Sequence, residues 1–159
     1  MIRNFIIIYY IVARNGYQMV YLTARSMAID SSTRDYLKNV EDKNGFKLPK
    51  GPLFMSPKPL AEALTEALSD PAPAKKSKIL SILQLFDNKT KQNTIFFGSY
   101  GNSDSDMRAY QQAGLNSNLT YMINEDSILR RISDNHQTSY RNHLMNVNNI
   151  YPIVTTNEN

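Results

Sequence analysis

The feature that most constrains the fold is a short apolar run that stops abruptly at polar residues. Met19 to Leu22 favours a β-strand, and Thr23-Ala24-Arg25 follows it directly. In an open α/β sheet, ligands bind at the edge where the carboxyl ends of the strands meet. A hydroxyl beside a guanidinium suits a phosphate group at that edge. A buried strand followed by an ordinary capped helix gives the same pattern, so this stretch leaves both interpretations open.

Composition indicates one globular domain. The chain has 159 residues, of which 42% are hydrophobic, so we expect a single modest core over residues 1–154 and a flexible tail over 155–159. The net charge of +4 suits an anionic ligand or membrane surface. The sequence has no Lys/Arg block of the kind found in nucleic-acid-binding tails, so we expect no nucleic-acid partner. The chain has no Cys, which excludes disulfides, thiolate zinc sites and a cysteine nucleophile.

The apolar run Phe5–Val12 is too short to span a bilayer, which takes about 20 residues. The residues after it, Ala13 to Tyr17, do not resemble a signal-peptide cleavage site. Composition alone favours a strand, but Arg14-Asn15-Gly16 is typical of a helix end with a left-handed glycine. We therefore predict a buried helix over residues 3–14 and an intracellular protein.

The rest of the chain alternates strands with helices, which favours a parallel sheet flanked by helices. The predicted extended segments are Met19–Thr23, Leu53–Met55, Thr94–Gly98 and Leu119–Ile123. The predicted helices run from a Ser31 or Ser32 cap to about Asn44-Gly45, over 58–69, from Lys76 to Phe86, from an Asp104 or Ser105 cap to Gly114, and over Tyr140–Val147. Residues 70–74 are predicted to interrupt the helices, 87–93 to form a polar turn, and 127–138 to lack a clear pattern.

Two loops could converge at one edge of such a sheet. Thr23 and Arg25 follow one predicted strand, and Gly101–Asp106 follows another, so a parallel arrangement would place both at the same edge. Within the second loop, Asn102 and Asp106 offer the amide and carboxylate oxygens that Mg²⁺ prefers.

Other interpretations of these residues are structural. Lys78 could supply positive charge to a phosphate, but lysines near a helix start are usually solvated. Asp104-Ser105-Asp106 could be no more than a helix cap with first-turn acids. His136 and His143 lack metal-ligand spacing, so we expect them on the surface.

Several short motifs, in one order along the chain, resemble the C-terminal catalytic half of the lipins. They are Gly16–Arg25, Thr33–Leu37, Leu48–Leu53, Ser56-Pro57 and Phe97–Asp106, and the resemblance extends from about residue 3 to Val154. Lipins are Mg²⁺-dependent phosphatidate phosphatases of the haloacid-dehalogenase superfamily. The resemblance therefore implies an LNS2 domain with an α/β, haloacid-dehalogenase-like Rossmannoid fold, in which helices flank a parallel sheet.

The resemblance also implies roles for five residues. Thr23 matches the hydroxyl that holds the phosphate, where lipins commonly have Ser, and Arg25 matches the Arg of the same motif. Lys78 falls where the phosphate-binding Lys is expected. The metal-site motif reads Gly-Asn-Arg-x-x-Asp in lipins and here supplies Asn102 and Asp106, with a serine in place of the Arg.

One departure from the family pattern concerns catalysis. Lipins begin this domain with a strand that ends in Asp-x-Asp-x-Thr, whose first Asp is the nucleophile and whose second is the general acid/base. This chain starts after that point, and Asp104-Ser105-Asp106 belongs to the metal loop. We therefore expect the first catalytic strand, which lies in the middle of the sheet, to be missing, and we assign no catalytic residue in this chain.

Three functional interpretations remain. The sequence favours a fragment of a phosphatidate phosphatase, inactive by itself, with Mg²⁺ bound weakly. The alternative is a non-catalytic LNS2 module that binds phosphatidate, as in membrane-associated phosphatidylinositol-transfer proteins. A decayed paralogue without a ligand is the third. The first two imply phosphatidate as the partner and peripheral association, from the cytoplasm, with the endoplasmic reticulum or nuclear membrane.

Overall fold

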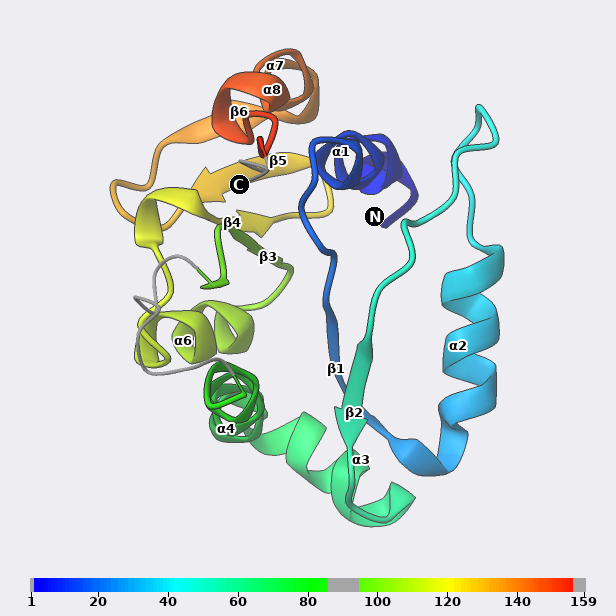
Figure 1. Ribbon diagram of the computed structural model, residues 1–159. Coiled ribbons are helices and arrows are strands. Elements are labelled where there is room, and N and C mark those ends of the chain that lie inside the picture. The colour runs from blue at the N-terminus through cyan, green and yellow to red at the C-terminus, as the bar shows by residue number, and fades with distance from the viewer. Residues whose placement is uncertain (1, 86–94, 156–159) are drawn as a thin grey trace.

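The strands fall into two separate sheets (Figure 1). The computed structural model describes residues 2–85 and 95–155. Within these residues, β1 (Tyr21–Ser26) pairs in parallel with β2 (Leu53–Ser56). The second sheet has the order β3-β4-β5-β6, and its strands are β3 (Ser99–Gly101), β4 (Thr120–Ile123), β5 (Ile128–Arg131) and β6 (Gln137–Ser139). β3 and β4 are parallel, whereas β5 is antiparallel to both of its neighbours.

The α/β architecture is confirmed, but the three main predicted strands do not share one parallel sheet in the described part of the chain. The strand expected at Leu119–Ile123 is confirmed as β4. The strand expected at Met19–Thr23 starts at Tyr21 and continues to Ser26, so it includes the polar residues that were expected to follow it. It is hydrogen-bonded to β2 alone among the described strands.

The strand predicted at Thr94–Gly98 is wrong for the residues that the structure describes. Phe97 and Gly98 precede β3, and Thr94 lies outside the described residues. The Phe97 ring packs 4.9 Å from the Tyr17 ring and 5.7 Å from the Tyr151 ring, measured between centroids. Phe97 therefore packs in an aromatic cluster and is not part of a strand. The strand forms instead from Ser99–Gly101, which follow the predicted strand.

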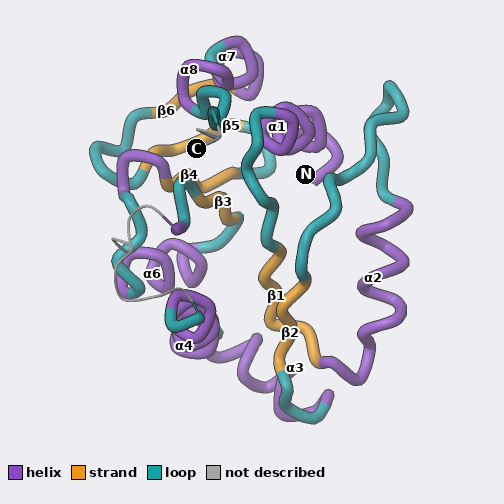
Figure 2. Tube along the Cα trace, viewed as in Figure 1, coloured by secondary structure: helices purple, strands orange, loops and turns teal. Residues whose placement is uncertain are grey.

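Helices surround the two sheets. They are α1 (Ile2–Arg14), α2 (Asp30–Asn39), α3 (Leu60–Ser69), α4 (Ala72–Leu83), α6 (Asp104–Gln112), α7 (Tyr140–Met145) and α8 (Val147–Ile150), with short 3-10 helices η1 (Met27–Ile29) and η2 (Ser117–Leu119). α4 packs against both β1 and α6, and α6 packs against β3 and β4. α4 and α6 together therefore connect the two sheets (Figure 2).

α1 confirms the predicted helix. It ends before Gly16, whose φ of +98° is the left-handed conformation that glycine adopts without strain. Phe5, Ile8 and Val12 recur at helical spacing and enter the largest core cluster. No helix in residues 2–85 and 95–155 is long and apolar enough to cross a membrane.

Two helix starts differ from prediction. The residue before α2 is Ile29, which makes no side-chain cap, so the predicted Ser31 or Ser32 cap is wrong. Ser26 instead caps η1 by accepting from the Ala28 N–H at 3.1 Å. α4 starts at Ala72, four residues early, because proline is tolerated in a first helical turn.

Other helix boundaries also differ. α2 ends at Asn39, several residues before the expected stop. The helix predicted over Tyr140–Val147 ends at Met145 as α7, and α8 follows from Val147. α3 agrees with the predicted helix over 58–69. The end of α6 before Gly114 is confirmed by that residue's φ of +78°. The polar turn at 87–93 and the tail beyond Thr155 lie outside the described residues.

The C-terminal third contains structure that its polar pattern conceals. β5 and the first two residues of β6 lie within the stretch where no clear pattern was found, and Leu129 of β5 is fully buried. His143 is also buried, which contradicts the expected surface position. Its Nε2 lies 2.8 Å from the Tyr100 hydroxyl, and burial lowers the pKa of His143 to about 4. The ring is therefore neutral at pH 7.

Candidate functional site

A cavity of about 620 Å³ lies between β1 and the start of α6. Residues of β1, α3, α4 and the turn after β3 line it. Four of the five predicted site residues are among them, namely Thr23, Arg25, Asn102 and Asp106. The fifth, Lys78, lines a neighbouring cavity of about 370 Å³, which Thr23 also borders. The two segments expected at one edge therefore do line the same cavity, although they belong to different sheets.

Asp106 is the most fully engaged group in this cavity. Its side chain is buried, and its Oδ2 accepts hydrogen bonds from the Asn102 N–H at 3.0 Å, the Ser103 N–H at 3.2 Å and the Ser103 hydroxyl at 2.9 Å. The Ser103 hydroxyl in turn accepts from the Asp106 N–H at 3.2 Å, which completes a capping box. Ser103, not the predicted Asp104 or Ser105, is therefore the cap of α6.

Lys75, which was not predicted as a site residue, completes the site. Lys75 Nζ lies 2.5 Å from Asp106 Oδ1, and both side chains are nearly buried. Lys75 lines the cavity, whereas Lys78 does not. The helical period alone does not separate the two lysines, because each lies four residues before a buried isoleucine of α4, Ile79 for Lys75 and Ile82 for Lys78. The phosphate-binding role of Lys78 stays a prediction.

Thr23 and Arg25 lie within β1 and not after it. The Thr23 Oγ1 accepts a hydrogen bond from the Arg25 N–H at 3.2 Å, and the pairing register with β2 is irregular between Leu22 and Ser26. Such irregularities redirect side chains near binding sites. Beyond it, the buried Ser26 hydroxyl donates to the Lys58 carbonyl at 2.7 Å and fixes the end of the strand. Arg25 is exposed at the cavity and has no carboxylate partner among the described residues.

Gly101 allows the Asp106 carboxylate to approach the strand. A Cβ on this residue would lie 2.5 Å from the Asp106 Cβ and 2.7 Å from the Met107 Cε, distances that side-chain atoms do not tolerate. Glycine is therefore required at position 101 for a steric reason. A larger residue at position 101 would displace Asp106 from Lys75.

The donor set of this cavity does not by itself fit a magnesium ion. Asp106 is the sole carboxylate among the described residues that line the cavity, and both of its oxygens already have partners. The exposed Asn102 adds one amide oxygen at most. No group of three or more His, Cys, Asp or Glu side chains placed to hold a metal occurs in residues 2–85 and 95–155.

The inner wall of the cavity is aromatic. Tyr9, Tyr100 and Tyr110 line it, and the Tyr110 hydroxyl donates to the Tyr100 carbonyl at 2.9 Å. Burial raises the pKa of all three phenols, and for Tyr110 the Asp106 charge raises it further. These side chains therefore stay neutral, so the ionic groups of the cavity are Arg25, Lys75 and Asp106.

Comparison with known proteins agrees with the motifs. The LNS2 (Lipin/Ned1/Smp2) family matches residues 3–152. Phosphatidic acid phosphohydrolase 1 of Saccharomyces cerevisiae is 36% identical over 124 residues, which cover 72% of this chain and 14% of that protein. Phosphatidate phosphatase LPIN2 of Homo sapiens is 29% identical over 96% of this chain and 17% of its own length. Human LPIN1, also a phosphatidate phosphatase by name, is 30% identical over 92% of this chain and 16% of its length. The chain thus spans less than a fifth of these relatives, and over nearly all of its own length it belongs to the LNS2 (Lipin/Ned1/Smp2) family.

Proposed function

We propose that the cavity between β1 and α6 binds the phosphomonoester headgroup of phosphatidate, and that the chain is part of a phosphatidate phosphatase. The observation that carries this proposal is the convergence of Thr23, Arg25, Lys75 and Asp106, from β1, α4 and α6, on one cavity. The printed names of the relatives support phosphatidate as the phosphomonoester.

The charges and donors of the cavity suit a phosphate dianion. The Arg25 guanidinium can donate two parallel hydrogen bonds to phosphate oxygens, and the Thr23 hydroxyl can donate one more. Lys75 adds a compact positive charge. Asp106 holds that ammonium at the cavity wall through the 2.5 Å contact. In this arrangement Asp106 positions Lys75, and the two cations bind the ligand.

We also propose that a further parallel strand occupies the space between β1 and β3 and completes a haloacid-dehalogenase-like sheet. Among the described strands, β1 pairs with β2 alone and β3 with β4 alone, so each has one edge without a strand partner. A second cavity, of about 310 Å³ and largely apolar, lies between these edges and is lined by Met19, Leu22, Ile79 and Phe97 among others. A strand added at such edges gains main-chain hydrogen bonds from both sides.

This added strand would supply the catalytic carboxylates. Covalent phosphoryl transfer needs an activated nucleophile, and the lipin motif Asp-x-Asp-x-Thr would bring it to the cavity beside Lys75 and Asp106. Residues 1–154 would then form one LNS2 domain that lacks this strand, with residues 155–159 as its tail. By itself the chain would be inactive.

Magnesium belongs to the same proposal. In the complete site, Asn102 and Asp106 would contribute to holding Mg²⁺ together with carboxylates from the added strand. In this chain alone, the contact between Lys75 and Asp106 competes with metal binding, so we expect weak binding of Mg²⁺.

A non-catalytic, phosphatidate-binding module is the second candidate. Lys75 neutralises Asp106, which is the sole carboxylate among the described residues of the cavity, so the site is arranged to bind a phosphate more than to attack one. In both cases the chain would associate peripherally with the cytoplasmic side of the endoplasmic reticulum or nuclear membrane, without a nucleic-acid partner.

Vesicle flotation tests the binding site. Arg25→Gln should weaken binding to phosphatidylcholine vesicles that contain phosphatidate by about tenfold, because a charged hydrogen-bond pair to phosphate is lost. Binding to vesicles that contain phosphatidylserine at equal charge should change little. Arg141→Gln, an exposed arginine that does not line the cavity, is the matched control. Equal losses for Arg25→Gln on both lipids would contradict a specific phosphate site.

A phosphate-release assay tests the added strand. The purified chain should release no more phosphate from phosphatidate than a sample without protein, with or without Mg²⁺, because the loss of a nucleophile typically costs several powers of ten in rate. Magnesium-dependent release well above that blank would show that the chain has its own nucleophile and would refute the added strand.

A further inference from the structure

A stripe of leucines on α3 is exposed beside the cavity. Leu60, Leu64 and Leu68 recur every four residues, so they lie along one face of the helix. Their exposed fractions are 49%, 58% and 79%. Met27 of η1, which packs against α3, is 59% exposed and extends the stripe. Contiguous apolar surface of this kind marks an interaction site more often than scattered single residues do.

The stripe leads directly into the cavity. Leu60 and Leu64 are exposed on the surface and also line the cavity. The buried Ala63, between them in the sequence, lines it too. α3 itself packs on β1, the strand that carries Thr23 and Arg25. A ligand with its phosphate near Arg25 would therefore have an apolar path along α3 to the protein surface.

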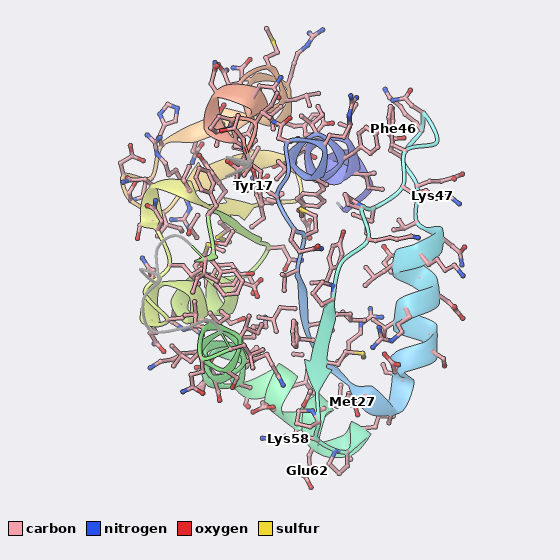
Figure 3. The ribbon with its side chains drawn as sticks, in the orientation of Figure 1. Tyr17, Met27, Phe46, Lys47, Lys58 and Glu62 are labelled. Carbon is pink, nitrogen blue, oxygen red and sulfur yellow. The ribbon has the colours of Figure 1, made fainter. Side chains whose placement is uncertain are left out.

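The charges around α3 suit an anionic surface. Arg25 is exposed at the cavity and Lys75 lines its wall. The acidic side chains of α3, Glu62 and Glu66, lie on a different face from the leucines, because successive helical residues are about 100° apart. Glu66 is moreover paired with Lys58 at 3.0 Å. Figure 3 places Lys58, Glu62 and Met27 at the same end of the molecule.

We infer that Met27, Leu60, Leu64 and Leu68 form a docking surface that rests on an anionic phospholipid bilayer. This docking surface would let a phosphomonoester lipid enter the cavity while its acyl chains stay in the membrane. The inference rests on the proposed function. The bilayer is favoured over another occupant because the apolar stripe is continuous with a cationic cavity and because the chain carries a net charge of +4.

An introduced tryptophan can report contact with the bilayer, since the chain has no Trp of its own. In Leu68→Trp, the indole emission should shift to shorter wavelength when vesicles of phosphatidylcholine with phosphatidate are added. Met145→Trp is the control, because Met145 is 76% exposed and α7 lies at the opposite end of the molecule from α3 (Figure 1). No shift for Leu68→Trp, or an equal shift for both variants, would overturn the inference.

A binding measurement separates this inference from the proposed function. The double variant Met27→Ser/Leu68→Ser changes two residues that do not line the cavity, and it should weaken vesicle binding about tenfold. Its affinity for soluble glycerol 3-phosphate should match that of the unaltered chain. Leu85→Ser, at a leucine that is 79% exposed like Leu68, should bind vesicles within about twofold of the unaltered chain.

The outcomes point to different conclusions. Unchanged vesicle affinity in the double variant would overturn the docking surface, whereas a phosphatidate preference in that same experiment would still support the proposed function. Equal binding of the unaltered chain to phosphatidate and phosphatidylserine vesicles would contradict the proposed function. The loss of vesicle affinity in Met27→Ser/Leu68→Ser could still be measured in that case. A change from dimer to monomer in the double variant, with unchanged vesicle affinity, would assign the stripe to contact between two copies and overturn the inference.

Discussion

The four-stranded sheet and the β1–β2 pair differ in how much apolar surface they bury. β4 and β5 pack on α1 and α8 through a cluster that includes Phe5, Tyr121, Leu129 and Tyr151, all nearly inaccessible to solvent. The β1–β2 pair is half-exposed along most of its length, and α2 beside it buries little more than Thr33. The half that provides Thr23 and Arg25 is therefore the less tightly packed one.

This difference in packing separates the part of the molecule that contributes most to stability from the part that provides β1 to the cavity. Regions with few buried apolar contacts open at lower free energy than a protein's core, and binding elements are commonly drawn from them. The cavity lies between the two halves, with Asn102 and Asp106 on the well-packed side and β1 on the other. A ligand that joins both sides would stabilise β1 more than it stabilises the core.

The largest expected effect is in the core of the four-stranded sheet. Leu129→Ala should lower the free energy of unfolding by about 2 to 5 kcal/mol, because Leu129 is fully buried and its removal leaves a cavity. Leu37→Ala, in the half-buried surface of α2, should cost about 1 kcal/mol or less. Urea denaturation of both variants measures the difference. Similar losses would mean that the two halves are equally well packed.

The second effect is a pH dependence confined to the four-stranded half. Because the pKa of His143 is about 4 in the folded chain and 6.5 in the reference state, the unfolded chain takes up its proton first as pH falls. The stability due to neutral His143 is complete above about pH 6.5 and is lost towards pH 4, by up to about 3 kcal/mol. Urea denaturation at successive pH values measures this loss, and His143→Gln should flatten the profile over this range. An unchanged profile in His143→Gln would contradict the role of His143.

The third effect lies at the boundary between the halves. Gly101→Ala should lower stability by about 1 to 3 kcal/mol and weaken phosphomonoester binding, because the new Cβ would displace Asp106. Gly45→Ala provides the control, since open space surrounds that residue and only its φ of +80° opposes a side chain, at about 1 kcal/mol. Calorimetric titration with glycerol 3-phosphate should separate the two variants, and intact binding in Gly101→Ala would contradict the steric role of the glycine.

The smallest effect concerns the looser half alone. Lys58→Ala breaks a partly exposed ion pair with Glu66, so it should cost about 0.2 to 1 kcal/mol at low salt and less at high salt. Arg108→Ala, which breaks the exposed pair with Asp70 near α4 and α6, should cost a similar amount. A much larger loss for Lys58→Ala would show that this pair is essential for holding α3 beside β1.

Local sequence signals predicted the elements that depend on local chemistry. The helix end at Gly16 and the strand at Leu119–Ile123 were correct, because a left-handed glycine and a short apolar run determine them within a few residues. The strand at Thr94–Gly98 was misplaced because the partly buried Phe97 packs against Tyr17 and Tyr151, which are distant from it in the sequence. A local sequence pattern does not reveal packing between residues that are so far apart along the chain.

In the candidate site, too, some features were predicted from local sequence and others depend on contacts between distant residues. The motifs predicted that Thr23, Arg25, Asn102 and Asp106 come together, and all four line one cavity, although Thr23 and Arg25 lie within β1 and not in a loop after it. Choosing between Lys75 and Lys78 required knowing which face of α4 points inward, and that depends on packing against β1 and α6. The separation into two sheets depends on which strand edges meet, and periodicity carries no such information.

The fastening of α1 to the C-terminal segment has a consequence for the order in which the chain folds. The Asn15 side chain donates to the Tyr151 carbonyl at 2.6 Å, and the Val154 N–H donates to the Asn15 carbonyl at 2.8 Å. The buried residues that share a core cluster with Phe5 and Val12 but lie outside α1 are likewise more than a hundred residues along the chain. Contacts this distant form slowly, because a long loop must close first. During synthesis on the ribosome, the apolar face of α1 therefore stays uncovered until Tyr151 has been synthesised.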